Sequence, residues 1–284
     1  MSVVCITGAK GFIGSHLYKL HDTTCQILCC DPRDSKMIDP KQLINVLKRN
    51  SPNVIYHLGA ISSTTETNIE KISTNNIQFS CELLEYCIKE SIPFVYASSA
   101  SVYGLGSEGF CESAKESPLN YYAISKTSLD MFVKQKIIDH PEATIVGLRY
   151  FNVYGQNEHH KGDMASPIHK FIIQAKSGEI KVFEGSEKYL RDFVYVGDVA
   201  KITKESVNFK SGIYNVGTGN PRSFLEVAEI ISKETGAQIK TMPFPKHLKG
   251  KYQSYTCSDN RKINTFCDIE RISLESGIKQ VMYE

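Results

Sequence analysis

The sequence predicts an α/β protein: a Rossmann-type doubly wound parallel sheet with a smaller, interleaved mixed α/β subdomain. Short strand-like runs alternate with helical stretches through the first two-thirds of the 284 residues, which is typical of βαβ units. The runs are continuously apolar, as expected of strands covered on both faces. A glycine-rich turn joins the first strand to the first helix.

The elements are expected in the following order. Strands fall at 3–7, 26–30, 53–59, 94–99 and 144–151, and helices at 12–20, 67–90 and 120–139. After residue 152 the pattern is mixed, with helices near 166–176 and 223–235 and strand-like runs at 180–185, 212–219 and 237–244. We therefore expect a nucleotide-binding domain over 1–152, to which 192–207 returns. The smaller subdomain then covers 153–191 and 208–284.

Composition excludes some function classes and indicates a compartment. Lys+Arg 33 against Asp+Glu 31 gives a net charge of +2, so no strong field favours nucleic acid or an acidic membrane surface. No apolar run approaches the roughly 20 residues that span a bilayer, and the start has no signal-peptide pattern. The nine cysteines form no CxxC pair. We expect free thiols in a reducing cytoplasm.

The stretch "TGAKGFIG" (7–14) follows a strand and opens a helix. Gly8 permits a tight turn, Gly11 lets the backbone approach a diphosphate, and Gly14 lets the helix pack on the strand. Asp31 closes the next strand, at about the 20-residue interval expected of a ribose-binding carboxylate. The pattern predicts a nicotinamide dinucleotide at the positive end of the helix dipole.

Arg33 bears on which dinucleotide binds. A guanidinium two residues past Asp31 could meet a 2′-phosphate and favour NADP. It could equally be a solvated loop arginine, in which case NAD is possible. NADP is the prediction, with NAD as the alternative.

The stretch "NYYAISK" (120–126) contains Tyr-x-x-x-Lys, from Tyr122 to Lys126. On a helix this spacing places both side chains on one face. An ammonium beside the phenol favours the phenolate, so we expect Lys126 to lower the pKa of Tyr122 and fit it for proton transfer. Upstream, "ASSASVYG" ends a strand with a hydroxyl at Ser99, where catalytic groups of parallel sheets lie. Alone, such a Tyr–Lys pair is more often a surface pair.

The stretch "HHKGDMAS" (159–166) is a candidate metal site, a solvated loop or a part of the chemistry. Adjacent histidines point to different sides in any regular structure, and no acid or cysteine cluster accompanies them. We expect no metal.

Taken together, TGxxGFIG, SSAxVYG, YxxxK and "RYFNVYG" (149–155) resemble the extended short-chain dehydrogenase/reductases, which act on nucleotide sugars. Longer strings, such as "HLGAISSTTE" (57–66), "RYFNVYGQNEHHKGDMAS" (149–166) and "VFEGSEKYLRDFVYVGDVA" (182–200), resemble the heptose 6-epimerases of that family. The resemblance covers nearly the whole chain. It implies an epimerase that inverts C6″ of an ADP-linked heptose with NADP, and a smaller subdomain that holds the nucleotide sugar.

The resemblance also implies residue roles. The catalytic residues would be Ser99, Tyr122, Lys126 and, as a second acid/base, Lys161. The cofactor would contact Gly8, Gly11, Phe12, Ile13, Gly14, Asp31, Arg33, Leu58, Gly59, Ala60, Ile61, Ser62, Asn75 and Val153, besides Tyr122 and Lys126. The substrate would contact Asn152, Asp163, Phe183, Glu184, Gly185, Ser186, Arg191 and Tyr252, besides Ser99 and Lys161.

A second acid/base suits this chemistry, because the hydroxyl lies in a different place once the carbon is inverted. Tyr122 would serve one epimer and Lys161 the other. The sequence departs from the pattern at Asp163, where the family has a small hydroxyl residue. A carboxylate there could pair with Lys161 and make it a poorer base. The segment between Asp31 and His57 is also short for the family.

Two alternatives stay open at this point. The sugar could be another nucleotide heptose or a UDP- or GDP-linked hexose, acted on by an epimerase or a reductase. The chain could instead be a non-catalytic cofactor-binding relative. A homo-oligomer is expected, for which the apolar stretch 67–90 could supply contacts.

Overall fold

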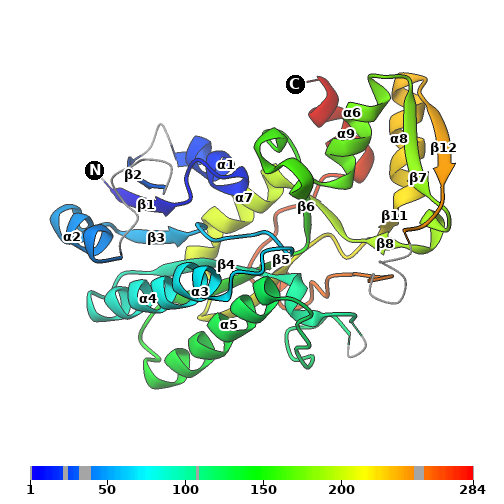
Figure 1. Ribbon diagram of the computed structural model, residues 1–284. Helices are drawn as coiled ribbons and strands as arrows, with labels where there is room; N and C mark the ends of the chain where they lie inside the picture. Colours follow the sequence, from blue (N-terminus) through cyan, green and yellow to red (C-terminus); the bar gives the residue numbers. More distant parts are fainter. Residues whose placement is uncertain (1, 22–24, 32–39, 107–108, 246–252, 284) are drawn as a thin grey trace.

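The computed structural model describes residues 2–21, 25–31, 40–106, 109–245 and 253–283. Its centre is a parallel six-stranded sheet in the order β10-β5-β4-β3-β1-β2 (Figure 1). The strands are β1 (Val3–Thr7), β2 (Gln26–Cys30), β3 (Val54–His57), β4 (Phe94–Ser99), β5 (Ile145–Tyr150) and β10 (Gly212–Val216). The predicted parallel sheet is confirmed.

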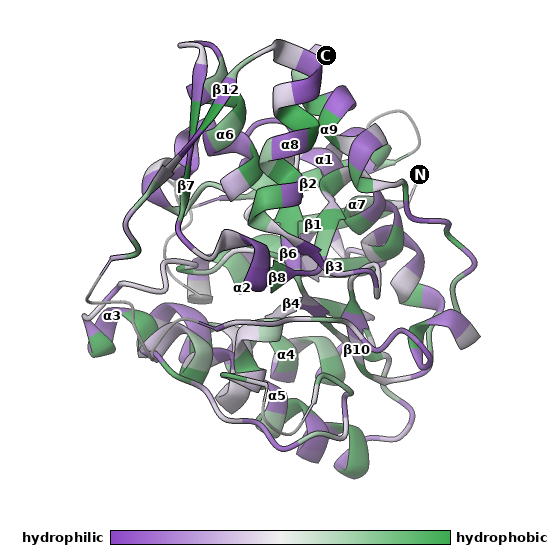
Figure 2. Cartoon of the chain, turned by 90° about the vertical axis from the view of Figure 1, so that its right-hand side faces the viewer, coloured by the Kyte–Doolittle hydropathy of each residue, from purple (hydrophilic) through white to green (hydrophobic). Residues whose placement is uncertain are grey.

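Helices cover both faces of this sheet. On one face α1 (Phe12–His21) packs against α7 (Val196–Glu205), over a core that includes Ile6, Leu17 and Val199. On the other face lie α2 (Pro40–Asn50), α4 (Phe79–Lys89) and α5 (Tyr121–Asp139), over Leu83, Phe94 and Leu129. Figure 2 shows hydrophobic green concentrated in the strands between these layers. Burial on both faces explains why the strand sequences are continuously apolar.

The strand order reverses between β1 and β3. From β1 the chain goes to β2 on one side, and then to β3, β4, β5 and β10 on the other. Thr7 at the end of β1 is in register with Cys30 of β2 and with His57 of β3. In open α/β sheets, ligands bind in the crevice outside the strand ends at such a switch point. The glycine-rich turn begins there.

A smaller mixed part extends from the carboxyl end of the sheet (Figure 1). It contains the strand pairs β7 (Glu179–Phe183) with β12 (Gln238–Met242), β8 (Leu190–Arg191) with β11 (Arg222–Ser223), and β6 (Asn152–Tyr154) with β9 (Phe193–Tyr195). Its helices are α6 (Pro167–Ala175), α8 (Phe224–Thr235) and α9 (Leu274–Tyr283). Ile168, Ile180 and Ile231 belong to its core.

One boundary expected from the sequence needs correction. We placed all of 208–284 in the smaller subdomain, but β10 hydrogen-bonds in parallel with β5 over its whole length. Ile263 and Cys267 also pack in the core of the main sheet. The return of the chain to the large domain therefore includes this strand, because β5 needs a partner on its outer edge. The rest of the division stays a prediction.

The stretch 67–90 is helical but not uniform. It divides into α3 (Ile69–Ile72), the π-helical turn η1 (Ser73–Gln78) and α4. Short 3₁₀ turns are η2 (Ala100–Tyr103), η3 (His159–Met164), η4 (Ser186–Lys188), η5 (Ser206–Asn208) and η7 (Ile263–Thr265). No helix in the described ranges is both long and apolar enough to cross a membrane.

Candidate active site

The turn between β1 and α1 is built so that only glycine fits. Gly8 has φ +68°, and a Cβ there would lie 2.7 Å from the Gly59 nitrogen. A Cβ on Gly14 would lie 2.1 Å from the Gly8 carbonyl oxygen. The Lys10 N–H donates to Asp31 Oδ2 at 3.0 Å, which fixes the buried carboxylate beside the turn. This cradle fits the diphosphate and ribose of a nicotinamide dinucleotide.

The segment 58–62 is joined to this turn by a buried histidine that the sequence patterns do not identify. Ser80 Oγ donates to the Asn76 carbonyl at 2.8 Å, so it accepts from His57 Nε2, also at 2.8 Å. Nδ1 of the same ring then accepts from Thr7 Oγ1 at 2.8 Å, and Thr7 Oγ1 accepts from the Gly59 N–H at 3.1 Å. Burial lowers the pKa of His57 to about 3, so the ring stays neutral. The donor and the acceptor in each of these hydrogen bonds therefore stay the same.

Asn75 and Asn76 differ in where they lie. Asn75, the predicted cofactor contact, is exposed, and its amide donates to the Lys71 carbonyl at 2.7 Å. Asn76 is fully buried and exchanges hydrogen bonds with both backbone groups of Ile61, at 2.8 and 2.9 Å. It also donates to Ser125 Oγ at 3.0 Å. The π-helical turn η1 thus aims Asn76 inward, and the role of Asn75 stays a prediction.

The structure brings Ser99, Tyr122 and Lys126 together. Ser99 ends β4, and its hydroxyl hydrogen-bonds Tyr122 near the start of α5. Lys126, one turn further on, lies with Nζ 5.9 Å from the centroid of the Tyr122 ring. Its ammonium is buried and donates to the Ala97 carbonyl at 2.7 Å. The expected placement of these groups at a strand end and on one helix face is therefore seen.

The pKa of Tyr122 is shifted in the direction opposite to the one that the sequence predicts. We predicted that Lys126 lowers the pKa of the phenol, but burial raises the pKa of Tyr122, and the hydrogen bond with Ser99 only partly opposes this. The physical reason is desolvation, which disfavours the phenolate in a half-buried site. Burial also lowers the pKa of Lys126 to about 8, although Asp130 opposes the shift. Both shifts favour the uncharged forms of Tyr122 and Lys126, whereas the sequence predicts a phenolate beside an ammonium.

A buried cluster of charged and polar side chains lies against the buried face of α5. Arg149 Nε donates to Asp130 Oδ2 at 2.8 Å, and both side chains are fully buried. Arg149 also pairs with Glu116 and donates to Tyr103 Oη at 3.0 Å. Tyr96 Oη donates to Asp130 Oδ1 at 2.8 Å. The arginine of the "RYFNVYG" stretch thus fixes the helix that carries Tyr122.

Lys161 lies on η3, the loop between β6 and α6. Its Nζ is 3.4 Å from Glu158 Oε2 and 4.6 Å from the centroid of the Phe12 ring, at the start of α1. The expected ion pair with Asp163 is wrong, because the carboxylate that pairs with Lys161 is that of Glu158. Asp163 is exposed on the far side of a kink at Gly162, and its carbonyl accepts from Lys170 Nζ at 2.8 Å.

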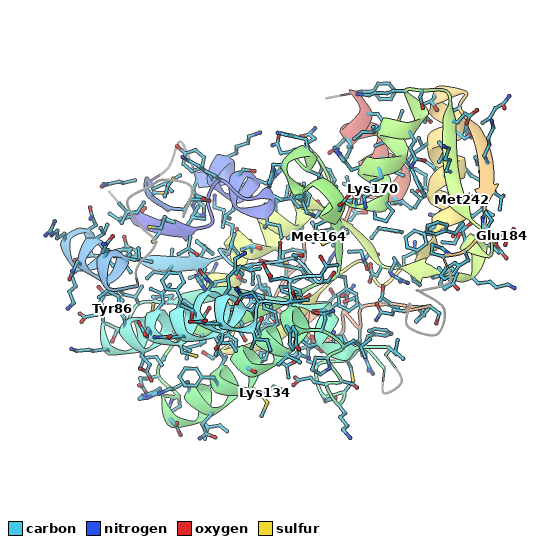
Figure 3. The ribbon with its side chains drawn as sticks, in the orientation of Figure 1. Tyr86, Lys134, Met164, Lys170, Glu184 and Met242 are labelled. Atoms are coloured by element: carbon cyan, nitrogen blue, oxygen red, sulfur yellow. The ribbon has the colours of Figure 1, made fainter. Side chains whose placement is uncertain are left out.

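The predicted substrate contacts lie along the smaller part. Phe183 ends β7 and packs edge-on to Phe244, and the Glu184 N–H donates to the Met242 carbonyl at 2.9 Å. Figure 3 shows Glu184 and Met242 side by side there. Gly185 adopts a left-handed conformation before the buried Ser186. Arg191 is buried, and its guanidinium donates to the Leu190 and Gln253 carbonyls.

The remaining predicted site residues are placed as follows. Asn152 Oδ1 accepts from Thr256 Oγ1 at 3.2 Å, and Val153 packs beside the sheet core. Ile13 and Leu58 pack against that same core. Arg33 and Tyr252 lie outside the described residues. Within the described ranges, no group of three or more His, Cys, Asp and Glu side chains could hold a metal.

Comparison with known proteins identifies relatives over the whole chain. The model of the NAD dependent epimerase/dehydratase family matches residues 4–217. ADP-L-glycero-D-manno-heptose-6-epimerase of Brachyspira hyodysenteriae is 37% identical over 306 aligned residues, which cover 98% of this chain and 96% of the relative.

Solved structures agree with that match. ADP-L-glycero-D-manno-heptose-6-epimerase of Helicobacter pylori has a TM-score of 0.86 and 29% identity, covering 99% of this chain and 95% of its own. UDP-glucose 4-epimerase of Thermotoga maritima, solved with UDP-glucose, has a TM-score of 0.86 and 25% identity, covering 99% and 97%.

Proposed function

The chain belongs to the NAD dependent epimerase/dehydratase family, and we propose that it inverts C6″ of ADP-D-glycero-D-manno-heptose to give ADP-L-glycero-D-manno-heptose. As a member of that family it is an isomerase that works with a nicotinamide cofactor. The observation that supports the proposal is that two separate groups of side chains are placed where each could transfer a proton. Ser99, Tyr122 and Lys126 form one, and Lys161 beside Phe12 forms the other.

Inversion of a carbinol carbon requires these two positions. The hydroxyl of one epimer loses its proton as the C6″ hydride leaves, which gives a transient ketone on the sugar. The ketone then presents its opposite face, and the new hydroxyl receives its proton from a different direction. A bound nicotinamide supplies the hydride chemistry and ends unchanged.

Different residues of the chain would transfer the proton for the two epimers. Tyr122 takes or gives the proton for one epimer, and Ser99 holds the sugar oxygen through its hydroxyl. The half-buried phenol stays protonated and is therefore a ready donor. Lys161 serves the other epimer from the loop above α1. General acid–base groups of this kind contribute about 10²- to 10⁴-fold each.

We propose NADP as the cofactor, with NAD as the alternative. Arg33 is the residue that would meet a 2′-phosphate, because a guanidinium pairs well with phosphate oxygens. The buried Asp31, held by the Lys10 N–H, is the group that a 2′-hydroxyl would meet. Arg33→Ala should weaken NADP and spare NAD, and equal affinities for both in the native chain would contradict the preference.

The nucleotide end of the substrate is proposed to lie along the smaller part. Phe183, Glu184, Gly185 and Ser186 surround the end of β7, and Arg191 follows on β8. Arg191 would bind the diphosphate in a bidentate way. Tyr252 and Asp163 complete the proposed contacts.

Conversion of the pure D,D-epimer is the direct test of the proposed activity. Purified protein with NADP should produce the L,D-epimer, followed by NMR of the heptose, with no net formation of NADPH. No conversion at high enzyme concentration would reject the substrate. UDP-glucose in a parallel reaction tests the hexose alternative, and net consumption of NADPH would indicate a reductase.

We also propose a cytoplasmic homo-oligomer. The nine cysteines all lie in the described ranges, and none of them forms a disulfide there, which suits a reducing compartment. Apolar side chains are exposed on α5 at Tyr121, Ile124, Met131 and Ile138, a spacing that places them along one face of the helix. A second copy would cover this face, and light scattering of the purified protein measures the state. A monomer at micromolar concentration would contradict the oligomer.

A further inference from the structure

Glu158 is a buried carboxylate that no predicted motif role explains. Its side chain is 0% exposed. Oε1 accepts from the Gly155 N–H at 3.0 Å and from Ser166 Oγ at 2.7 Å, and Oε2 accepts from the Ser166 N–H at 2.6 Å. A buried carboxylate is costly unless it is hydrogen-bonded and paired with a cation. These bonds supply the hydrogen-bond donors, and the cation is the ammonium of Lys161.

The same bonds close the loop that carries Lys161. Gly155 directly follows β6, and Ser166 is the N-cap of α6, with its hydroxyl accepting from the His169 N–H at 3.1 Å. Glu158 therefore joins the end of a strand to the start of a helix across η3. The helix N-terminus also favours a negative charge at this point. The side chain of Glu158 thus holds the loop between β6 and α6 from its buried side.

The ammonium of Lys161 is held between two groups. Glu158 Oε2 lies 3.4 Å from Nζ on one side, and the Phe12 ring centroid lies 4.6 Å away on the other. The lysine side chain is 22% exposed, so part of it faces solvent. A lysine has a long flexible side chain, and contacts at its end restrict its rotamers. Phe12 follows Gly11, so the amine is directed to the cofactor turn.

We propose that Glu158 is the positioning residue for Lys161: its carboxylate holds the amine over Phe12, where the amine can exchange a proton with one epimer of the substrate. The proposal rests on the proposed function, in which Lys161 is the second acid/base. A purely structural Glu158 would act only by holding the loop, so any other substitution that loosens the loop would slow the Lys161 epimer as much. A positioning residue affects only the epimer that Lys161 serves.

The first experiment tests, without substrate, whether the Glu158 carboxylate restrains Lys161 Nζ; we call this contact the tether. Trace labelling with acetic anhydride, read by peptide mass spectrometry, compares Lys161 with the exposed Lys233 of α8 in the native protein and in Glu158→Gln. Loss of the carboxylate frees Nζ, so the relative labelling of Lys161 should rise by about threefold or more, as expected when a part-buried, paired amine becomes exposed. An unchanged ratio overturns the proposal, whatever the substrate is.

The second experiment separates the two epimers. In a single turnover, each epimer reduces the bound cofactor, which is followed by absorbance. Glu158→Gln and Lys161→Met should slow the reaction of the same epimer, by about tenfold and by 10²-fold or more, and leave the other within about twofold. The double variant should equal Lys161→Met, because the two residues act as one unit. Multiplying effects, or equal slowing of both epimers, overturn the proposal.

Ser166→Ala is the matched control for damage to the loop. It removes one bond to Glu158 and the cap of α6 but leaves the carboxylate beside Nζ. It should slow the Lys161 epimer much less than Glu158→Gln does, and equal slowing of that epimer by the two variants would overturn the proposal. If the native protein reduces its cofactor with neither epimer, the proposed function fails, and the labelling ratio alone then decides whether the tether exists.

Discussion

The two proposed proton-transfer positions are built in different ways. The Tyr122 position lies on regular elements, the end of β4 and the first turns of a 19-residue helix. The Lys161 position lies on a 3₁₀ loop with a kink at Gly162. In the first, a buried lysine is satisfied by a neutral carbonyl. In the second, a part-exposed lysine is paired with a buried carboxylate.

This difference indicates which contacts fix the proton-transferring side chain at each position. Tyr122 is fixed by backbone hydrogen bonds and by the Arg149–Asp130 cluster below α5, so few of its own contacts are needed. Lys161 lies on a short, kinked 3₁₀ turn, and the Glu158 carboxylate joins the two ends of that loop from within. Sites on helices and strands are held more precisely than sites on loops. A loop site therefore needs its own internal support.

The largest expected effect is the loss of the phenol. Tyr122→Phe should lower kcat for epimerisation by about 10³-fold, because it removes the proton that the first position exchanges. Tyr121→Phe is the matched control, since that neighbour is 42% exposed, and its kcat should stay within about twofold. Bound cofactor, measured by equilibrium dialysis, should be retained in both variants. Equal kcat values in the two variants would remove Tyr122 from the chemistry.

The buried Lys126 should make the stability of the protein depend on pH. Burial lowers its pKa to about 8 from 10.5 in the unfolded chain. Between these values the unfolded chain binds the extra proton, so the free energy of unfolding rises with pH, by at most about 3 kcal/mol. Urea unfolding from pH 7.5 to 10 should show this rise, and Lys126→Met should abolish it. Lys161→Met should keep the rise, and a flat profile in the native chain would exclude the shift.

The sequence predicts the first position better than the second. The glycine turn, Asp31, Ser99 and the Tyr122–Lys126 spacing follow from local patterns, because each depends on neighbours in one strand or helix. Local patterns do not identify His57 and Asn76, since their roles depend on contacts between distant segments, such as Thr7 with His57. Glu158 has its partners within eight residues, but they meet only through the irregular path of the loop, which no periodic pattern predicts. The predicted Asp163–Lys161 pair is wrong because the backbone kink at Gly162 separates the two residues.

The smallest expected effects separate the buried Asn76 from its exposed neighbour Asn75. Asn76→Ala strips the buried Ile61 backbone and Ser125 of their partners and should cost about 2 kcal/mol of unfolding free energy. Asn75→Ala removes one bond at the surface and should change stability by less than about 0.5 kcal/mol. Urea unfolding measures both. If Asn75 lines the cofactor, its variant weakens cofactor binding without loss of stability. Equal losses of stability would show that the direction of η1 does not decide which asparagine holds the Ile61 backbone and Ser125.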